Sequence, residues 1–244
     1  MSLQTPASLP DAQEPSFAYP PSPEGLGLSR EQLTFFRTFG FLKIPGFFTA
    51  EIDRIRQGFE EGFAADPDVM VLKQMYLQRG KERHICVKIA DRSPNLEWLK
   101  TDERLKAIAT AVLGSNHEYS ESDGSLFWCD TGWHADLYGA PLEVQHLKFS
   151  IYLDELDGQT GAIRFIPGSN HYRTGYAANL REWLSTEERT LERFAIPGIA
   201  IPSWTVDSTP GDLILWNYRS IHASYGGGER RRLLSMSFRE AVEK

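Results

Sequence analysis

A change of hydrophobic period near the middle of the chain most constrains what this sequence can fold into. Residues 146–153 alternate strictly between apolar and polar side chains. The apolar positions of this run are Leu147, Phe149, Ile151 and Leu153. Such alternation indicates a strand with two different faces, because successive side chains in a strand point to opposite sides. Short apolar runs separated by glycine and proline turns follow, so we expect the second half to form a β-sandwich or jelly roll.

The first half of the chain has helical spacing instead. Ser29 and Gln32 are placed as a capping box, which begins a helix, and Thr49 is positioned to cap a second helix over the apolar residues that follow. A third helical region spans residues 96–113 and ends at Gly114, a residue type that commonly follows a helix C-terminus. We expect this third region to pack against the outside of a sheet.

Length and composition favour one domain. A chain of 244 residues with 41% hydrophobic content can bury one sizeable core, and single β-sandwich or barrel domains of this length are common. Residues 1–27 are instead rich in proline and in small polar residues, a composition that cannot bury enough apolar surface to become ordered alone. We predict a flexible proline-rich arm over residues 1–27 and a single domain over residues 28–244.

Charge and cysteine content exclude several classes of protein. A net charge of −7 and a pI near 5.4 argue against a nucleic-acid surface, which needs clustered positive charge. The chain has no apolar run long enough to predict a membrane span, and its start lacks the pattern of a signal peptide. With only Cys86 and Cys129, a disulfide framework is not expected. We predict a cytoplasmic protein, because a reducing compartment suits both thiols.

Two separated histidine motifs carry the strongest chemical signal. His134 and Asp136 project to the same side of an extended strand, since Ala135 between them points away. An isolated pair of this kind is common on protein surfaces, but His222 lies on a second expected strand. Two imidazoles and one carboxylate match the facial triad of non-haem iron(II) sites, which leaves coordination positions open for substrate and oxygen. We therefore expect His134, Asp136 and His222 to form a catalytic metal site.

A run of arginines follows the second histidine. Residues 230–232 are all arginine, and they lead into residues 233–238, which have the pattern of a final strand. A guanidinium group grips a carboxylate through two parallel hydrogen bonds, whereas a lysine offers only a point charge. An arginine at this place would suit a dicarboxylate co-substrate. Ser224, two residues after His222, would share its face in a regular strand and could reach the same carboxylate.

The order and spacing of these motifs resemble those of the phytanoyl-CoA dioxygenase family of iron(II)- and 2-oxoglutarate-dependent oxygenases. The resemblance extends from about residue 28 to residue 238. The pieces that carry it are residues 33–48, 87–114, 134–136, 151–169 and 210–238. It implies a fold that is mainly β with flanking helices, namely a double-stranded β-helix, which is a cupin-like jelly roll with its metal at the open end.

The resemblance also assigns roles to individual residues. It implies that the three triad residues bind iron(II) and that Arg231 binds 2-oxoglutarate, with Arg232 as the alternative arginine. Lys88 matches a position where some family members place a lysine near 2-oxoglutarate, although a solvated strand lysine explains it equally well. The resemblance therefore implies iron(II), 2-oxoglutarate and O₂ as cofactors and co-substrates.

The implied reaction is hydroxylation of an unactivated C–H bond in a small metabolite or natural-product intermediate, or a desaturating or cyclising variant, with release of succinate and CO₂. Asp136 favours these outcomes over halogenation, because related halogenases have a small residue in its place. Residues 66–83 and 171–208 lack a strong period, and we expect them to form lids that determine the substrate. Two other classes stay open: a cupin-type metalloenzyme that does not use 2-oxoglutarate, and a non-catalytic jelly-roll binding protein.

Overall fold

The computed structural model describes residues 27–73, 82–137, 141–227 and 230–241. Of the predicted arm over residues 1–27, all but Gly27 lies outside these ranges. Within them, no helix combines the length and the apolar character that crossing a membrane requires.

The first helix begins where the sequence predicts it. Helix α1 spans Arg30–Phe39, and Ser29 caps it: the Gln32 amide donates to Ser29 Oγ (3.2 Å) and the Ser29 amide donates to Gln32 Oε1 (2.7 Å). The two hydrogen bonds are the reciprocal pair of a capping box. Helix α1 ends at Gly40, whose φ of 87° favours glycine.

Helix α2 spans Ile52–Ala65, and the prediction that Thr49 caps it was wrong. Glu51 occupies the cap position without a side-chain hydrogen bond. Thr49 lies in a preceding turn, in which its own amide donates to the Gly46 carbonyl (3.2 Å) and the Glu51 amide donates to the Phe48 carbonyl (3.0 Å). Because the amides of Thr49 and Glu51 are used in this turn, the helix starts later than the position of Thr49 suggests.

The expected third helix is divided into three pieces. Helix α3 spans Pro94–Glu97, a 3₁₀ helix spans Trp98–Thr101, and α4 spans Glu103–Leu113 before Gly114. Asp102 causes the last division, since its carboxylate accepts from the amides of Arg104 (2.8 Å) and Leu105 (3.3 Å) and so caps a new helix. A further 3₁₀ helix, Ile89–Asp91, precedes α3.

The strands form two antiparallel sheets. The seven-stranded sheet has the order β1 (Phe41–Ile44), β9 (Leu213–Asn217), β6 (His146–Tyr152), β11 (Arg231–Glu240), β4 (His117–Phe127), β3 (Glu82–Val87) and β2 (Met70–Lys73). The four-stranded sheet has the order β5 (Thr131–His134), β10 (His222–Ser224), β7 (Ile163–Phe165) and β8 (Trp204–Thr205).

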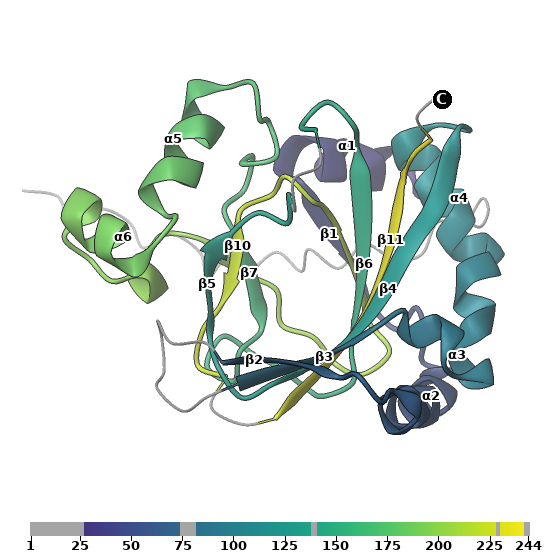
Figure 1. The fold of residues 1–244 in the computed structure, drawn as a ribbon. Coiled ribbons are helices and arrows are strands. Elements are labelled where there is room, and N and C mark those ends of the chain that lie inside the picture. The colour runs from purple at the N-terminus through teal and green to yellow at the C-terminus, as the bar shows by residue number, and fades with distance from the viewer. Residues whose placement is uncertain (1–26, 74–81, 138–140, 228–229, 242–244) are drawn as a thin grey trace, which may run out of the picture.

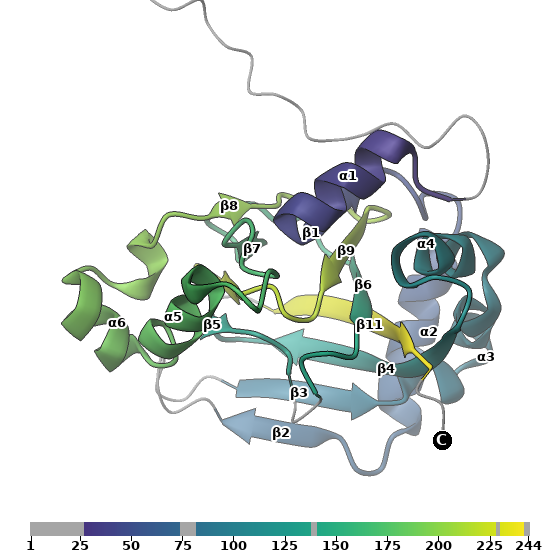
Figure 2. The same ribbon diagram turned by 90° about the horizontal axis from the view of Figure 1, so that it is seen from above.

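The two sheets form a jelly roll, which confirms the predicted mainly-β fold with flanking helices. Helices α2, α3 and α4 lie on the outer side of the seven-stranded sheet, as expected for the third helical region (Figure 1). Figure 2 shows β3 and β2 extending this sheet beyond β4.

The faces of β6 differ as the alternation predicts. Leu147, Phe149 and Ile151 are fully buried in the hydrophobic core under the helices. Lys148, Ser150 and Tyr152 point the other way, into the interior between the two sheets, as the contacts of Lys148 with Asp136 and of Tyr152 with Ser224 require. The sheet therefore has an apolar outer face and a partly polar inner face.

Both segments expected to form irregular lids contain regular structure. Residues 171–208 include α5 (Gly175–Trp183), α6 (Glu187–Phe194), a 3₁₀ helix (Gly198–Ala200) and β8. Thr174 and Thr186 cap the two helices by accepting from backbone amides three residues on. In residues 66–83, β2 and the start of β3 are described, and residues 74–81 lie outside the described ranges.

Candidate metal centre

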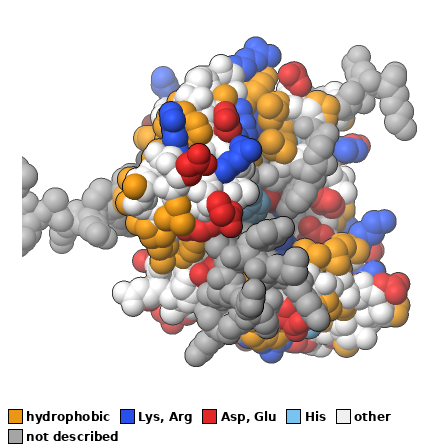
Figure 3. Space-filling model, turned by 60° about the vertical axis from the view of Figure 1, so that its left-hand side comes forward, with side chains coloured by type: hydrophobic (Ala, Val, Ile, Leu, Met, Phe, Trp, Pro, Cys, Tyr) orange, Lys and Arg blue, Asp and Glu red, His pale blue; other side chains and the backbone are white. Residues whose placement is uncertain are grey.

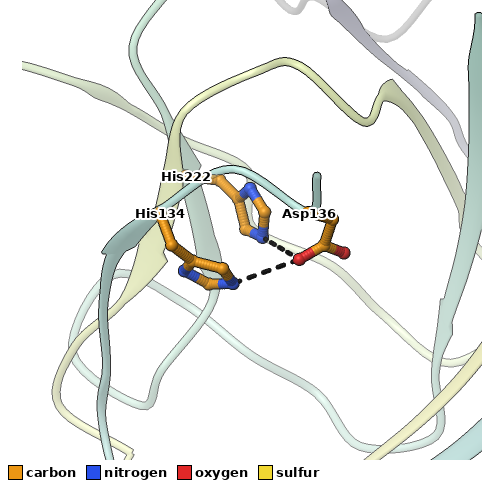
Figure 4. Close-up of side chains that lie close together, drawn as sticks. All are labelled: His134, Asp136 and His222. Carbon is orange, nitrogen blue, oxygen red and sulfur yellow. Dashed lines mark ion pairs between the residues drawn. The ribbon is translucent and has the colours of Figure 1, made fainter. Parts of the chain in front are cut away.

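The structure brings His134, Asp136 and His222 together from two neighbouring strands. His134 ends β5, Asp136 follows it by two residues, and His222 begins β10 directly opposite His134 in the strand register. The Asp136 Oδ1 atom lies 3.3 Å from His134 Nε2 and 3.9 Å from His222 Nε2 (Figure 4). The three potential ligand atoms all lie within 4.8 Å of one another.

Both imidazoles are held in the orientation that a metal ligand needs. His134 Nδ1 donates to the Gly132 carbonyl (2.8 Å), and His222 Nδ1 donates to the Ser220 carbonyl (3.0 Å). Because a carbonyl can only accept, the proton of each neutral ring resides on Nδ1 and the lone pair on Nε2 faces Asp136. Burial lowers the pKa of His222 to about 3, with repulsion from His134 adding to the effect, so this ring stays neutral.

A buried lysine fixes the carboxylate of the triad. Lys148 Nζ lies 2.5 Å from Asp136 Oδ2, which leaves Oδ1 toward the histidines. Burial opposes ionisation of Asp136, but the charge of Lys148 holds its pKa well below its usual range. The carboxylate is therefore charged and directed at a single point.

The alternation of residues 146–153 puts Lys148 on the polar face of its strand but does not connect it with the site. The only signal was a lysine between the buried positions Leu147 and Phe149. A lysine is almost never fully buried unless it is paired, so its position predicts an acidic partner without identifying which one.

Aromatic side chains enclose the second histidine. The Trp216 ring centroid lies 4.2 Å from that of His222, and the Phe165 centroid lies 5.9 Å away. Both rings belong to an apolar cluster that fills one half of the interior between the sheets. This cluster lowers the water content around His222 while leaving His134 more exposed, at 36% of its side chain.

Arg231 lies in the interior, where its hydrogen bonds to described residues all go to carbonyls and its guanidinium lies over the Phe127 ring. Its guanidinium donates to the carbonyls of Gly161 (2.5 Å) and Cys129 (2.7 Å), and Nε has no hydrogen-bond partner. Among the residues that the structure describes, no carboxylate pairs with it, and burial lowers its pKa. A Cβ atom at Gly161 would lie 2.8 Å from Arg231 Nε, so glycine is needed for the guanidinium to fit.

Ser224 and Tyr152 lie beside this arginine. The Ser224 hydroxyl and the charge of Arg231 both act on the Tyr152 phenol. Burial raises the pKa of Tyr152, so it stays protonated. Sequence analysis named Ser224 and missed Tyr152, although Tyr152 belongs to the same alternating row of β6 as Lys148.

The other two predicted contacts lie elsewhere. Arg232 points to the opposite side of β11, where its guanidinium pairs with Asp154 (2.6 Å) and Glu60 (3.1 Å). Lys88 is exposed and has a φ of 55°, so it follows β3 in a left-handed conformation and is not a strand residue as expected. In the described parts of the chain, Lys88 forms no hydrogen bond or ion pair with the triad or with Arg231.

The donor atoms suit a divalent metal ion that keeps open positions. Two imidazole nitrogens and one carboxylate oxygen are the ligand set of a facial triad, and no thiolate is among them. Figure 3 shows a histidine side chain recessed in a hollow on this face of the molecule. The arrangement thus combines a three-ligand metal site with a second group, Arg231, Tyr152 and Ser224, that could hold an anion.

A protein-family model matches most of the chain. The family model of phytanoyl-CoA dioxygenase (PhyH) matches residues 36–232. A search of curated proteins found no match.

Several solved structures share the fold. The carbocyclase SnoK from nogalamycin biosynthesis is 19% identical with a TM-score of 0.67, and the match covers 88% of this chain and 85% of that chain. The epimerase SnoN, in complex with Fe³⁺, alpha ketoglutarate and nogalamycin RO, is 19% identical with a TM-score of 0.66, covering 86% and 83%. HygX from Streptomyces hygroscopicus, with nickel, 2-oxoglutarate and hygromycin B bound, is 20% identical with a TM-score of 0.64, covering 86% and 87%.

Proposed function

The chain belongs to the phytanoyl-CoA dioxygenase family, and from this premise we propose that it is an iron(II)- and 2-oxoglutarate-dependent oxygenase that acts on a C–H bond of a small molecule. One observation carries the proposal. Three convergent ligand atoms lie in the same interior as a buried arginine that has no carboxylate partner among the described residues. The first group suits a metal ion and the second suits an acidic co-substrate.

His134, Asp136 and His222 would hold the iron. Their donor atoms converge on one point, and each imidazole is already oriented by a backbone carbonyl. Lys148 keeps Asp136 charged and turned toward the histidines, which is the usual role of a group hydrogen-bonded to a metal ligand.

Arg231 would bind the distal carboxylate of 2-oxoglutarate. Leaving a guanidinium buried without a counter-charge is costly, and a carboxylate would remove that cost. Ser224 and Tyr152 offer two more hydroxyl groups at the same place. Arg232 is less suited to this role, because two carboxylates already pair with it on the outer side of the sheet.

Iron(II) with 2-oxoglutarate and O₂ supplies an oxidant that can remove hydrogen from an unactivated C–H bond, with succinate and CO₂ as by-products. The residues of this chain position the reactants and control their surroundings. Trp216 and Phe165 keep water from one side of the site, while the partly exposed His134 leaves the other side accessible.

Within this class we favour hydroxylation, or a related desaturation or cyclisation, of a small metabolite or natural-product intermediate. Asp136 occupies the position that related halogenases leave open for chloride. The solved carbocyclase and epimerase of nogalamycin biosynthesis support a role in small-molecule tailoring, since they have the same fold. A 2-oxoglutarate-independent enzyme or a non-catalytic binding protein would leave the buried Arg231 without a purpose.

The proposal is tested by anaerobic loading with iron(II) and 2-oxoglutarate, followed by exposure to O₂. We expect a visible charge-transfer band from the anaerobic complex and release of succinate after oxygen is admitted. Asp136→Ala should lose both signals, whereas the matched control Asp53→Ala, at an aspartate that is 94% exposed on α2, should keep them. Metal-dependent turnover of equal rate without 2-oxoglutarate would contradict the proposal.

A further inference from the structure

The inner face of the seven-stranded sheet carries polar groups that the metal site does not use. Asp123 on β4 pairs with Ser235 on β11, and Ser237 follows two residues further along β11 on the same face. The neighbours Leu234 and Met236 point the other way, into the core under the helices. We name Asp123, Ser235 and Ser237 the inner polar wall.

The wall adjoins the metal centre. Ser237 is directly opposite Lys148 in the register between β11 and β6, and Lys148 contacts the triad carboxylate. The charges of Lys148 and Asp136 both act on the carboxylate of Asp123. A molecule that reaches the metal from this side therefore meets the wall.

The polar side chains of the wall make no hydrogen bond or close ion pair with one another or with other described residues. These groups are the Asp123 carboxylate and the hydroxyls of Ser235 and Ser237, and the two serines are only 6% and 3% exposed. Two other serines of the same inner face differ. Ser125 accepts from Arg83 (3.0 Å), and Ser150 accepts from Trp216 Nε1 (3.0 Å). The wall thus lies toward the Lys148 end of this face, away from Arg231.

None of the wall oxygens is among the described side-chain atoms that are enclosed without a partner, so they stay accessible from the interior, where a bound ligand could hydrogen-bond them. A carboxylate accepts hydrogen bonds only, and serine hydroxyls both donate and accept. The positions of the wall are about 4.8 Å apart between strands and about 7 Å apart along a strand, which is the scale of a ring-sized molecule. These features suit a ligand with several hydrogen-bonding groups close together, at least one of them a donor.

We propose that the inner polar wall is the substrate subsite and that the substrate is a ring-sized molecule bearing several hydroxyl or amino groups. This inference rests on the proposed function, because the wall selects what reaches the metal. The apolar cluster around Trp216 and Phe165 borders the wall, since Trp216 is paired with Lys148 on the same sheet, and it would contact the less polar part of such a molecule. An unsubstituted hydrocarbon chain would leave the wall without hydrogen bonds.

The test uses the full chain loaded anaerobically with iron(II) and 2-oxoglutarate. Three probe sets are compared by ligand-observed NMR: neutral ring polyols such as methyl glucoside and inositol, aminated rings such as glucosamine and streptamine, and apolar compounds such as decanoate and cyclohexane carboxylate. We expect the hydroxylated or aminated rings to bind and the apolar compounds to bind more weakly. Relative affinities of the first two sets distinguish hydroxyl from ammonium recognition.

Substitutions locate the binding. Asp123→Asn and Ser235→Ala should each lower the affinity for the tightest-binding polar probe by about tenfold. This is the ratio expected when one hydrogen bond to a charged or buried group is lost. Both variants should retain the charge-transfer band of the iron(II)–2-oxoglutarate complex and an unchanged unfolding midpoint. The matched control Asp53→Asn should bind the probe as the parent does.

The outcomes separate this inference from the proposed function. If the band forms in the parent chain but apolar probes bind best, no polar ring binds, or Asp123→Asn has no effect on a polar probe, the substrate inference is overturned and the proposed function stands. If the parent chain forms no band, the proposed function is contradicted, and the substrate inference that rests on it is contradicted as well.

Discussion

The two faces of the seven-stranded sheet are built from the same strands and serve different ends. The outer face packs Leu147, Phe149 and Met236 under the helices, all fully buried. The inner face carries Lys148, Arg231 and the inner polar wall. Burial of hydrocarbon stabilises the first face, whereas the second holds buried charges that are costly without ligands. Along one strand, residues that stabilise the core therefore alternate with residues that line the interior next to the metal centre.

The largest expected effect is on the outer face. Phe149 is fully buried, and its ring centroid lies 5.6 Å from that of Phe238. Phe149→Ala should lower the free energy of unfolding by about 3–5 kcal/mol, because it removes a large buried side chain and leaves a cavity. Ser235→Ala, on the inner face, should change it by less than about 0.5 kcal/mol. Urea unfolding measures the free energy of unfolding of both variants. Equal losses would show that the two faces do not differ in their contribution to stability.

Neighbouring arginines on β11 test the same comparison with binding. Arg231→Met should weaken 2-oxoglutarate binding by about 10²-fold, since charged hydrogen bonds contribute roughly 1.5–3 kcal/mol each. Arg232→Met should leave this affinity unchanged, because its side chain pairs with Asp154 and Glu60 on the outer side. Titration of the anaerobic iron complex with 2-oxoglutarate gives both constants. A larger effect from Arg232 would reverse the assignment.

A smaller effect is expected at Lys148. Lys148→Gln should reduce iron(II) affinity by about 10- to 100-fold, the usual range for a group that orients a metal ligand. Lys43→Gln is the matched control, since Lys43 pairs with a buried carboxylate away from the triad, that of Asp212 (2.9 Å), just before β9. Anaerobic metal titration distinguishes the two variants. Unaltered iron affinity in Lys148→Gln would show that Asp136 does not need its lysine.

Local signals predicted part of the fold well. The capping box at Ser29 and the alternation of residues 146–153 each depend on side chains close in sequence, and both were confirmed. The predictions that failed concern places where a turn or a second helix cap competes with a continuous helix, which residue spacing does not show. A backbone turn displaced the start of α2 beyond Thr49, and Asp102 capped a new helix inside a region that reads as continuous.

The site was partly predictable for a similar reason. The spacing of His134 and Asp136 predicted that the two side chains lie together, and they do, although β5 ends at His134 and Asp136 lies just beyond the strand. The partners of that pair are far away in sequence. Lys148 reaches Asp136 only because β6 lies across the interior, and Tyr152 meets Ser224 only because the two sheets face each other.

The sequence by itself determined the strand periodicity, the type of the three potential metal ligands and the presence of an arginine pair near the end. The tertiary structure decided which arginine faces inward: the register of β11 with β4 and β6 directs Arg231 to the interior and Arg232 to the surface. The physical reason is that alternation fixes relative faces along a strand, whereas only packing against other elements decides which face is buried with the metal ligands.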